Sequence, residues 1–128
     1  MSAVSLAGFW LLAGGALLGW PLALSRIDPK ALRRIGIRYP KRILQMHIDF
    51  LMMGILAIAV GVALPDLPAW AAVPLVVGAV VNPILFLPLA IRASFEESTI
   101  YRAVSVASFT AMSAGTVGAA VYATQTYL

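Results

Sequence analysis

Residues 43–64 read ILQMHIDFLMMGILAIAVGVAL, and apart from one glutamine, one histidine and one aspartate this stretch is apolar. A transmembrane α-helix needs about 20 such residues, because each residue advances the helix by about 1.5 Å across a hydrocarbon core of about 30 Å. The stretch therefore predicts a membrane-spanning helix. It also contains His47, the only histidine of the chain. An ionisable side chain inside a span is a candidate functional residue.

Three further stretches have comparable length and apolarity, namely residues 3–25, 69–91 and 103–128. The first carries no charge and lacks the basic residues that open a signal peptide, so we interpret it as a span. The 128-residue chain is 62% hydrophobic and 11% charged. Soluble domains are about 45–50% apolar and about 25% charged. We therefore predict an all-α integral membrane protein, a single four-transmembrane-helix bundle over residues 1–128.

The segments between the spans carry most of the charge. Residues 26–42 read RIDPKALRRIGIRYPKR, and residues 92–102 read RASFEESTIYR. These two segments hold all nine Lys and Arg and lie on one side of a four-span chain, whereas the turn on the other side holds only Asp66. Because basic loops stay in the cytoplasm, we expect segments 26–42 and 92–102 to be cytoplasmic and both termini to lie outside. The expected location is a bacterial-type inner (plasma) membrane.

The sequence pI of about 10 has more than one interpretation. Since the basic residues follow the expected topology, we predict no nucleic-acid partner, while contact with anionic lipids or with a prosthetic group stays open. The chain has no cysteine. This excludes disulfides, thiolate zinc sites, cysteine-bound iron–sulfur clusters and covalently attached haem.

Small residues spaced four apart recur in three of the spans. The pairs are Gly15 and Gly19, Ala57 and Gly61, and Ala114 and Gly118. Such pairs allow helices to approach closely in a bilayer, where no hydrophobic force brings them together. They fit packing within one chain, and they also fit self-association of several chains.

Few polar side chains lie within the spans. Asp49 follows His47 by two residues and points to a different helix face; we predict an ion pair with Arg42 or Lys41, with a proton-relay or substrate role as the alternative. Asn82 is predicted to form an interhelical hydrogen bond. It precedes Pro83, which removes a helical hydrogen bond and predicts a kink beside a cavity.

The helix face that His47 shares suggests a flat apolar ligand. Its members at helical spacing are Phe50, Leu51, Gly54 and Ile58. Gly54 is expected to leave an open patch beside an aromatic ring. The basic residues Arg38, Lys41 and Arg42 stand just outside the span. Haem b needs an imidazole for its iron, an apolar slot and cations for its propionates, so haem b bound through His47 is one interpretation. A histidine that is merely hydrogen-bonded or reaches toward the interface is the other.

The segments MHIDFLMMGILAIAVGVALPDLP (46–68) and VVNPILFLP (80–88) resemble a known family. They are similar to the small four-span membrane isomerases typified by styrene oxide isomerase, and to the related hydroxylaminobenzene mutases. The matching features are a histidine that opens the second span, a glycine seven residues later, a Leu-Pro turn, and an asparagine followed by an aromatic residue. Here these are His47, Gly54, Leu64-Pro65, Asn82 and Phe86. The resemblance covers about residues 40–90.

The resemblance implies a trimer of four-helix protomers that binds haem b near the contact between neighbouring protomers. His47 would be the axial ligand, and the ferric iron would act as a Lewis acid toward a small apolar aryl epoxide, which rearranges to an aldehyde. This sequence departs from the family at Met53, where the family has asparagine, and at Phe86, where it has tyrosine. Asn82 and Tyr101 are the candidate catalytic residues that would replace those polar groups.

Two other functions stay open from the sequence. One is a non-catalytic haem-binding or redox accessory protein, in which Met53 approaches the iron. The other is a structural subunit of a larger membrane complex.

Overall fold

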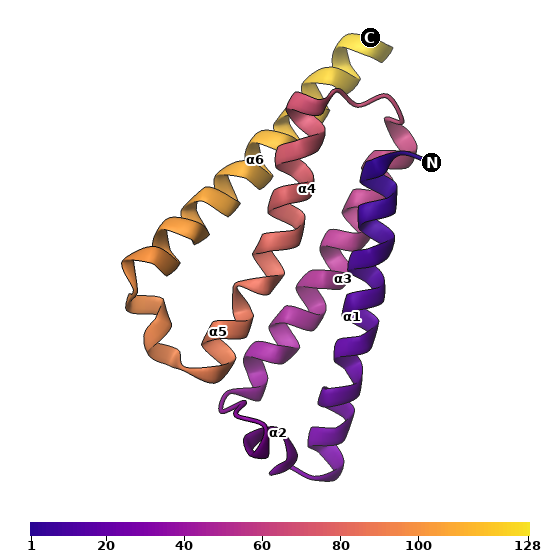
Figure 1. Ribbon diagram of the computed structural model, residues 1–128. Helices are drawn as coiled ribbons and strands as arrows, with labels where there is room; N and C mark the ends of the chain where they lie inside the picture. The colour runs from indigo at the N-terminus through magenta and orange to yellow at the C-terminus, as the bar shows by residue number, and fades with distance from the viewer.

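The computed structural model describes all residues, 1–128, and every regular element in it is a helix (Figure 1). The elements in chain order are α1 (Ala3–Ile27), α2 (Ala31–Arg34), α3 (Pro40–Ala63), α4 (Ala69–Ile84), α5 (Phe86–Ile91), the 3₁₀ helix η1 (Ala93–Glu97) and α6 (Thr99–Tyr127). Four stretches are long and apolar enough to cross a membrane, with α4 and α5 together forming the third. The prediction of an all-α, multi-pass membrane protein is thereby confirmed at the level of its four spans.

The helices form two antiparallel hairpins that lie side by side. Helix α1 packs along α3, and α4 packs along α6, while α3 joins the hairpins through α4 and α5. The four long helices follow one another in the order α1, α3, α4, α6 (Figure 1). Helices α1 and α6 do not form a packed pair, so the predicted bundle is an open array. Both chain ends lie at one end of the array, and α2 and η1 lie at the other, which we call the basic end because it carries every Lys and Arg.

The helices are longer than their apolar stretches. Helix α3 begins at Pro40, which is favoured in the first helical turn because its missing N–H needs no partner there. Helix α6 begins at Thr99, four residues earlier than predicted, and the Ser98 hydroxyl caps it by accepting a hydrogen bond from the Tyr101 amide. Hydropathy marks the part of a helix that crosses the bilayer, whereas helical hydrogen bonds continue into charged residues at the water boundary.

The third span is interrupted at Leu85, between α4 and α5. Pro83 and Pro88 flank this interruption, and neither can donate a helical hydrogen bond, which explains the break. The predicted kink is therefore present, but the expected cavity is not. Asn82 and Pro83 are buried, and the Ser108 hydroxyl of α6 donates a hydrogen bond to the Asn82 side-chain oxygen. The predicted interhelical hydrogen bond of Asn82 is confirmed.

Glycines line both hairpin seams. A β-carbon added at Gly8 of α1 would lie 2.8 Å from the carbonyl oxygen of Gly54 in α3, closer than real side chains come. In the other hairpin, a β-carbon at Gly115 would collide with the backbone of Leu75 in α4. The small-residue surfaces therefore pack helices within one chain, as one of the two interpretations predicted. Ala114 is exposed, and its neighbour Gly115 takes the place expected for it.

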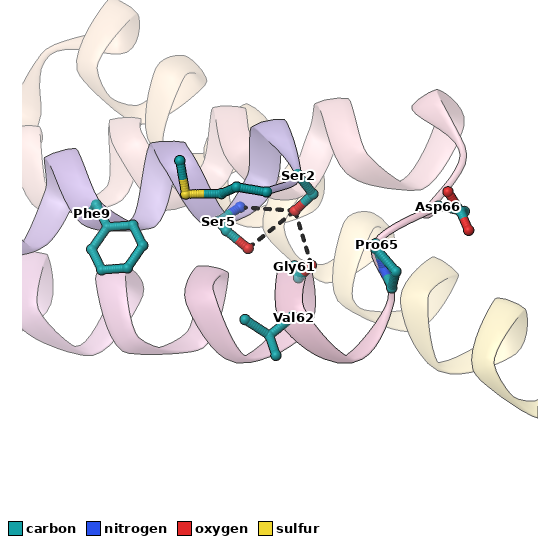
Figure 2. Close-up of a pocket in the computed structure, with 8 residues that line it drawn as sticks. Ser2, Ser5, Phe9, Gly61, Val62, Pro65 and Asp66 are labelled. Carbon is teal, nitrogen blue, oxygen red and sulfur yellow. Dashed lines mark hydrogen bonds between the residues drawn. The ribbon is translucent and has the colours of Figure 1, made fainter.

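The end of the α1–α3 seam opposite the basic end is closed by serine hydroxyls (Figure 2). The Ser2 hydroxyl donates to the Gly61 carbonyl oxygen at 2.9 Å and accepts from the Ser5 amide at 3.2 Å. These residues line a hollow of about 500 Å³ that Phe9 and Asp66 complete. The serine groups of this hollow bond to one another and to the backbone. We therefore interpret the hollow as the open end of the interface between α1 and α3.

Candidate functional site at His47

His47 lies in the α1–α3 seam, nearer to the basic end than to the other. Its Nδ1 atom is 2.6 Å from the carbonyl oxygen of Gly15 in α1. A carbonyl oxygen only accepts hydrogen bonds, so Nδ1 carries the proton and donates it. In the tautomer that this hydrogen bond selects, Nε2 is the ring nitrogen that carries a lone pair for a metal.

Two glycines of α1 lie beside the imidazole ring. Gly15 supplies the carbonyl group, and a β-carbon at Gly19 would lie 3.7 Å from Cε1 of His47. The Gly15–Gly19 pair that the sequence marks as a packing motif is therefore the surface against which the imidazole lies. The sequence contains no signal that names the Gly15 carbonyl as the partner, because every backbone carbonyl has the same chemistry.

The rest of the His47 face is filled by α1. A β-carbon at Gly54 would lie 2.8 Å from Leu12, and Phe50 lies beside Gly14 and Gly15. The open patch expected at Gly54 is therefore absent, because α1 occupies it. A porphyrin does not fit between α1 and α3 of one chain, and Gly54 serves the close packing of these two helices.

The side chains that flank this seam are exposed and apolar. Leu44, one turn before His47, is 44% exposed, and Ile48, directly after it, is 46% exposed. Trp20, directly after Gly19 in α1, is 75% exposed. His47 itself is only partly buried. The single chain thus offers a nitrogen ligand at the edge of an apolar surface.

The three predicted propionate partners do not share the face of His47. Arg42 donates to the Gln45 side-chain oxygen at 2.9 Å, and the Arg38 amide donates to Ala90 at the end of α5. Lys41 and Arg42 precede His47 by six and five residues, which places them about 120–140° away around the helix.

Arg26 is a better placed cation that the sequence interpretation missed. It follows Gly19 by seven residues, so it lies on the same face of α1, two turns closer to the basic end. The seven-residue spacing was the available signal, but it becomes informative only once Gly19 is known to face His47.

Asn82 and Tyr101, the two predicted catalytic residues, lie in the other hairpin. The Tyr101 hydroxyl donates to the carbonyl oxygen of Leu85 at 2.8 Å, across the break between α4 and α5. Asn82 is bonded to Ser108, as described above. Both side chains hold the third span against α6, and neither shares the α1–α3 seam with His47.

Asp49 does not form the predicted ion pair. The only salt bridge of the chain joins Arg34 to Asp28, at 3.0 Å. Asp49 instead lines a groove of about 200 Å³ between α3 and the start of α5, together with Phe86. The ion pair is absent because Arg42 is directed to Gln45 and Lys41 is exposed.

No group of three or more His, Cys, Asp or Glu side chains is arranged to hold a metal ion. A metal bound by this chain would therefore need most of its ligands from a prosthetic group or from a second chain. Haem meets this condition, because its porphyrin supplies four of the iron ligands and the protein only one or two.

Comparison with known protein families, curated proteins and solved structures gives no match for this chain.

Proposed function

We propose that the protein is an oligomeric membrane haemoprotein in which Nε2 of His47 ligates haem b at a contact between neighbouring chains. The observation that carries this proposal is the bond from Nδ1 of His47 to the Gly15 carbonyl oxygen. Histidines that bind metals usually donate their other N–H to a carbonyl or carboxylate, which selects the tautomer, orients the ring and raises its basicity. His47 already has this arrangement.

The apolar residues beside His47 support a slot shared by two chains. Because the α1–α3 seam is filled, the porphyrin would lie against its outer edge, where Trp20, Leu44 and Ile48 are exposed. A second chain packed on this edge would enclose it. Arg26 is the cation on the correct face of α1 to meet a propionate. The trimer implied by the family resemblance is one assembly that supplies such a contact.

The resemblance to styrene oxide isomerase extends the proposal to a reaction. The chemistry that haem b would supply is Lewis-acid polarisation of an epoxide C–O bond, so that a small apolar aryl epoxide rearranges to an aldehyde without net electron transfer. The chain's part would be to hold the imidazole through Gly15 and to place no second ligand at the iron. Met53 follows His47 by six residues and therefore points about 120° away around α3, so it is badly placed to fill that position.

Asn82 and Tyr101 would act on the substrate only from a neighbouring chain. In their own chain both are engaged in the α4–α6 hairpin. Haem binding and isomerisation are therefore tested separately.

Haem binding is tested on the intact protein, purified in detergent from cells well supplied with haem. We expect a Soret band that is lost in His47→Ala and restored when imidazole is added to His47→Gly. The matched control is Gln45→Ala, on the same helix, which should keep the band. A colourless, folded wild-type protein would rule out both the enzyme and the haem accessory function.

Isomerisation is tested by incubating the pigmented protein with an aryl epoxide and measuring the aldehyde. We expect turnover that disappears in His47→Ala. A six-coordinate, low-spin iron in both oxidation states, together with absence of turnover, would favour the accessory haem protein instead.

A further inference from the structure

Two hollows adjoin each other at the basic end, on the side of the molecule that carries α5 and η1. One, of about 360 Å³, is lined by Arg38 and Arg92. The other, of about 530 Å³, is an apolar trough that runs along α5 and the first turns of α6 to Val104. Ile91 and Phe95 line both, so a cationic mouth opens directly onto an apolar trough.

Backbone geometry brings the two arginines to the same mouth. The amides of Arg38 and Tyr39 both donate to the carbonyl oxygen of Ala90, at 2.9 and 3.0 Å. Gly36 has a φ of 91°, a conformation that other residues rarely adopt, and it turns the chain just before Arg38. Arg92 follows the last residue of α5, two positions after Ala90. Segments far apart in the sequence thus bring two arginines to the lining of one hollow.

Neither arginine is neutralised within the chain. The only ion pair of the protein joins Arg34 to Asp28, in the α2 region. Glu96 and Glu97 belong to η1, but neither lines the mouth or the trough. Two unpaired guanidinium groups at one mouth match the geometry of a phosphate group, which accepts hydrogen bonds from several N–H donors.

The trough requires a ligand that also has an apolar part. Its wall includes Leu87, Pro88, Ile100 and Val104, and Ile100 is 77% exposed. From the mouth, the trough leads along α6 toward the middle of the span. A phosphate beside an apolar chain at the end of a membrane span is the chemistry of a glycerophospholipid, and basic pockets at such positions bind anionic lipid headgroups.

We propose that this site binds one anionic glycerophospholipid, with its phosphate between Arg38 and Arg92 and one acyl chain along the trough. The lipid connects the segment before α3 to the segment after α5. It therefore holds together the two hairpins of the open array at their basic end. The site is separate from His47 and does not depend on haem.

The test measures lipid binding to the intact, detergent-purified protein by native mass spectrometry and by thermal melting. We expect phosphatidylglycerol to bind about tenfold more tightly than phosphatidylcholine and to raise the melting temperature. In the double variant Arg38→Gln/Arg92→Gln this preference should disappear. The matched control Lys30→Gln/Arg33→Gln removes the same charge from the same basic end of the protein and should keep the preference. The proposal would be overturned if the Arg38→Gln/Arg92→Gln variant kept the preference for phosphatidylglycerol, or if both double variants lost it equally.

The acyl part is tested with Val104→Trp, which fills the trough, against Val106→Trp, which lies outside it on the same helix. Only Val104→Trp should weaken the binding of long-chain phosphatidylglycerol. Dihexanoyl phosphatidylglycerol and inorganic phosphate distinguish a lipid from a free anion. If phosphate alone displaces the long-chain lipid at equal concentration, the trough is not part of the site. If the double arginine variant does not fold, the proposal is tested with Arg92→Gln alone and with the salt dependence of lipid binding to the wild-type protein. Salt-independent binding would contradict the proposal.

Discussion

The two hairpins use their polar side chains differently. In the α4–α6 hairpin, Asn82 is bonded to Ser108 and Tyr101 to the Leu85 carbonyl, so these polar groups are occupied in holding helices together. In the α1–α3 hairpin, His47 uses only one of its two ring nitrogens, in the bond to Gly15. A polar residue in a span thus becomes a candidate for chemistry when a donor or acceptor remains free after packing.

The two seams also differ in the side chains that lie beside them. Both are built on glycines that let backbones approach. Only the α1–α3 seam has a ligand-type side chain beside an exposed apolar edge. In the α4–α6 seam the polar side chains are bonded within the hairpin, and this hairpin contacts the first one through α3.

The largest expected effect comes from separating the helices of each hairpin. Gly8→Val and Gly115→Val each place new atoms against backbone of the facing helix, so each should lower the free energy of unfolding by about 1–3 kcal/mol. Only Gly8→Val should also reduce the Soret absorbance of the folded fraction, because only it disturbs the α1–α3 seam. Gly14→Ala is the control, since its β-carbon would meet only Phe50 at an ordinary 3.9 Å. Equal loss of pigment in both valine variants would show that the hairpins do not act separately.

Breaking the bond between Asn82 and Ser108 should have the next largest effect. Asn82→Ala and Ser108→Ala should each lower the thermal stability by about 1 kcal/mol, the usual range for hydrogen bonds between transmembrane helices. The double variant should cost less than the sum, because the two side chains share one interaction. The Soret absorbance should stay unchanged in both single variants and in the double variant. Additive losses would mean that each side chain has an independent partner.

Tyr101→Phe removes one hydrogen bond to the break at Leu85 and keeps the ring in place. We expect a loss of about 0.5–1 kcal/mol in thermal stability and an unchanged Soret band. This variant also tests the catalytic prediction for Tyr101. If aldehyde formation falls by more than tenfold while stability and pigment hold, the hydroxyl contacts substrate in the site of a neighbouring chain.

The smallest expected effect has the opposite sign. Asp49 is the only carboxylate within a span, and no cation pairs with it in the chain. Asp49→Asn removes the charge and keeps the shape of the side chain. It should therefore raise the thermal stability by about 0.5–1 kcal/mol, which is a fraction of the free-energy cost of placing a charge deep in a bilayer. Asp66→Asn, at the exposed turn, should leave the stability unchanged. A destabilised Asp49→Asn would reveal a partner for this carboxylate in the assembled protein.

The open arrangement of the helices bears on self-association. Many of the large apolar side chains of the long helices are exposed, and lipid or neighbouring chains must cover them. Gly15, Gly61 and Gly118 do not serve this purpose, because they are buried within the hairpins. Self-association, if it builds the haem slot, therefore uses the larger side chains near Trp20 and Ile48.

The four spans, the end that carries the basic residues and the small-residue seams follow from the sequence alone. These features depend on local composition, since about 20 apolar residues span a bilayer whatever surrounds them. The sequence also located His47 near the start of α3.

Which side chains meet follows from the folded structure alone. Helix α1 fills the Gly54 patch, and Asp49 has no ion pair. Asn82 and Tyr101 lie apart from His47, whose Nδ1 donates to the Gly15 carbonyl oxygen. The physical reason is that these outcomes depend on the rotation of each helix about its axis and on which helices are neighbours. Packing between helices sets both quantities, and hydropathy along the chain carries little information about either.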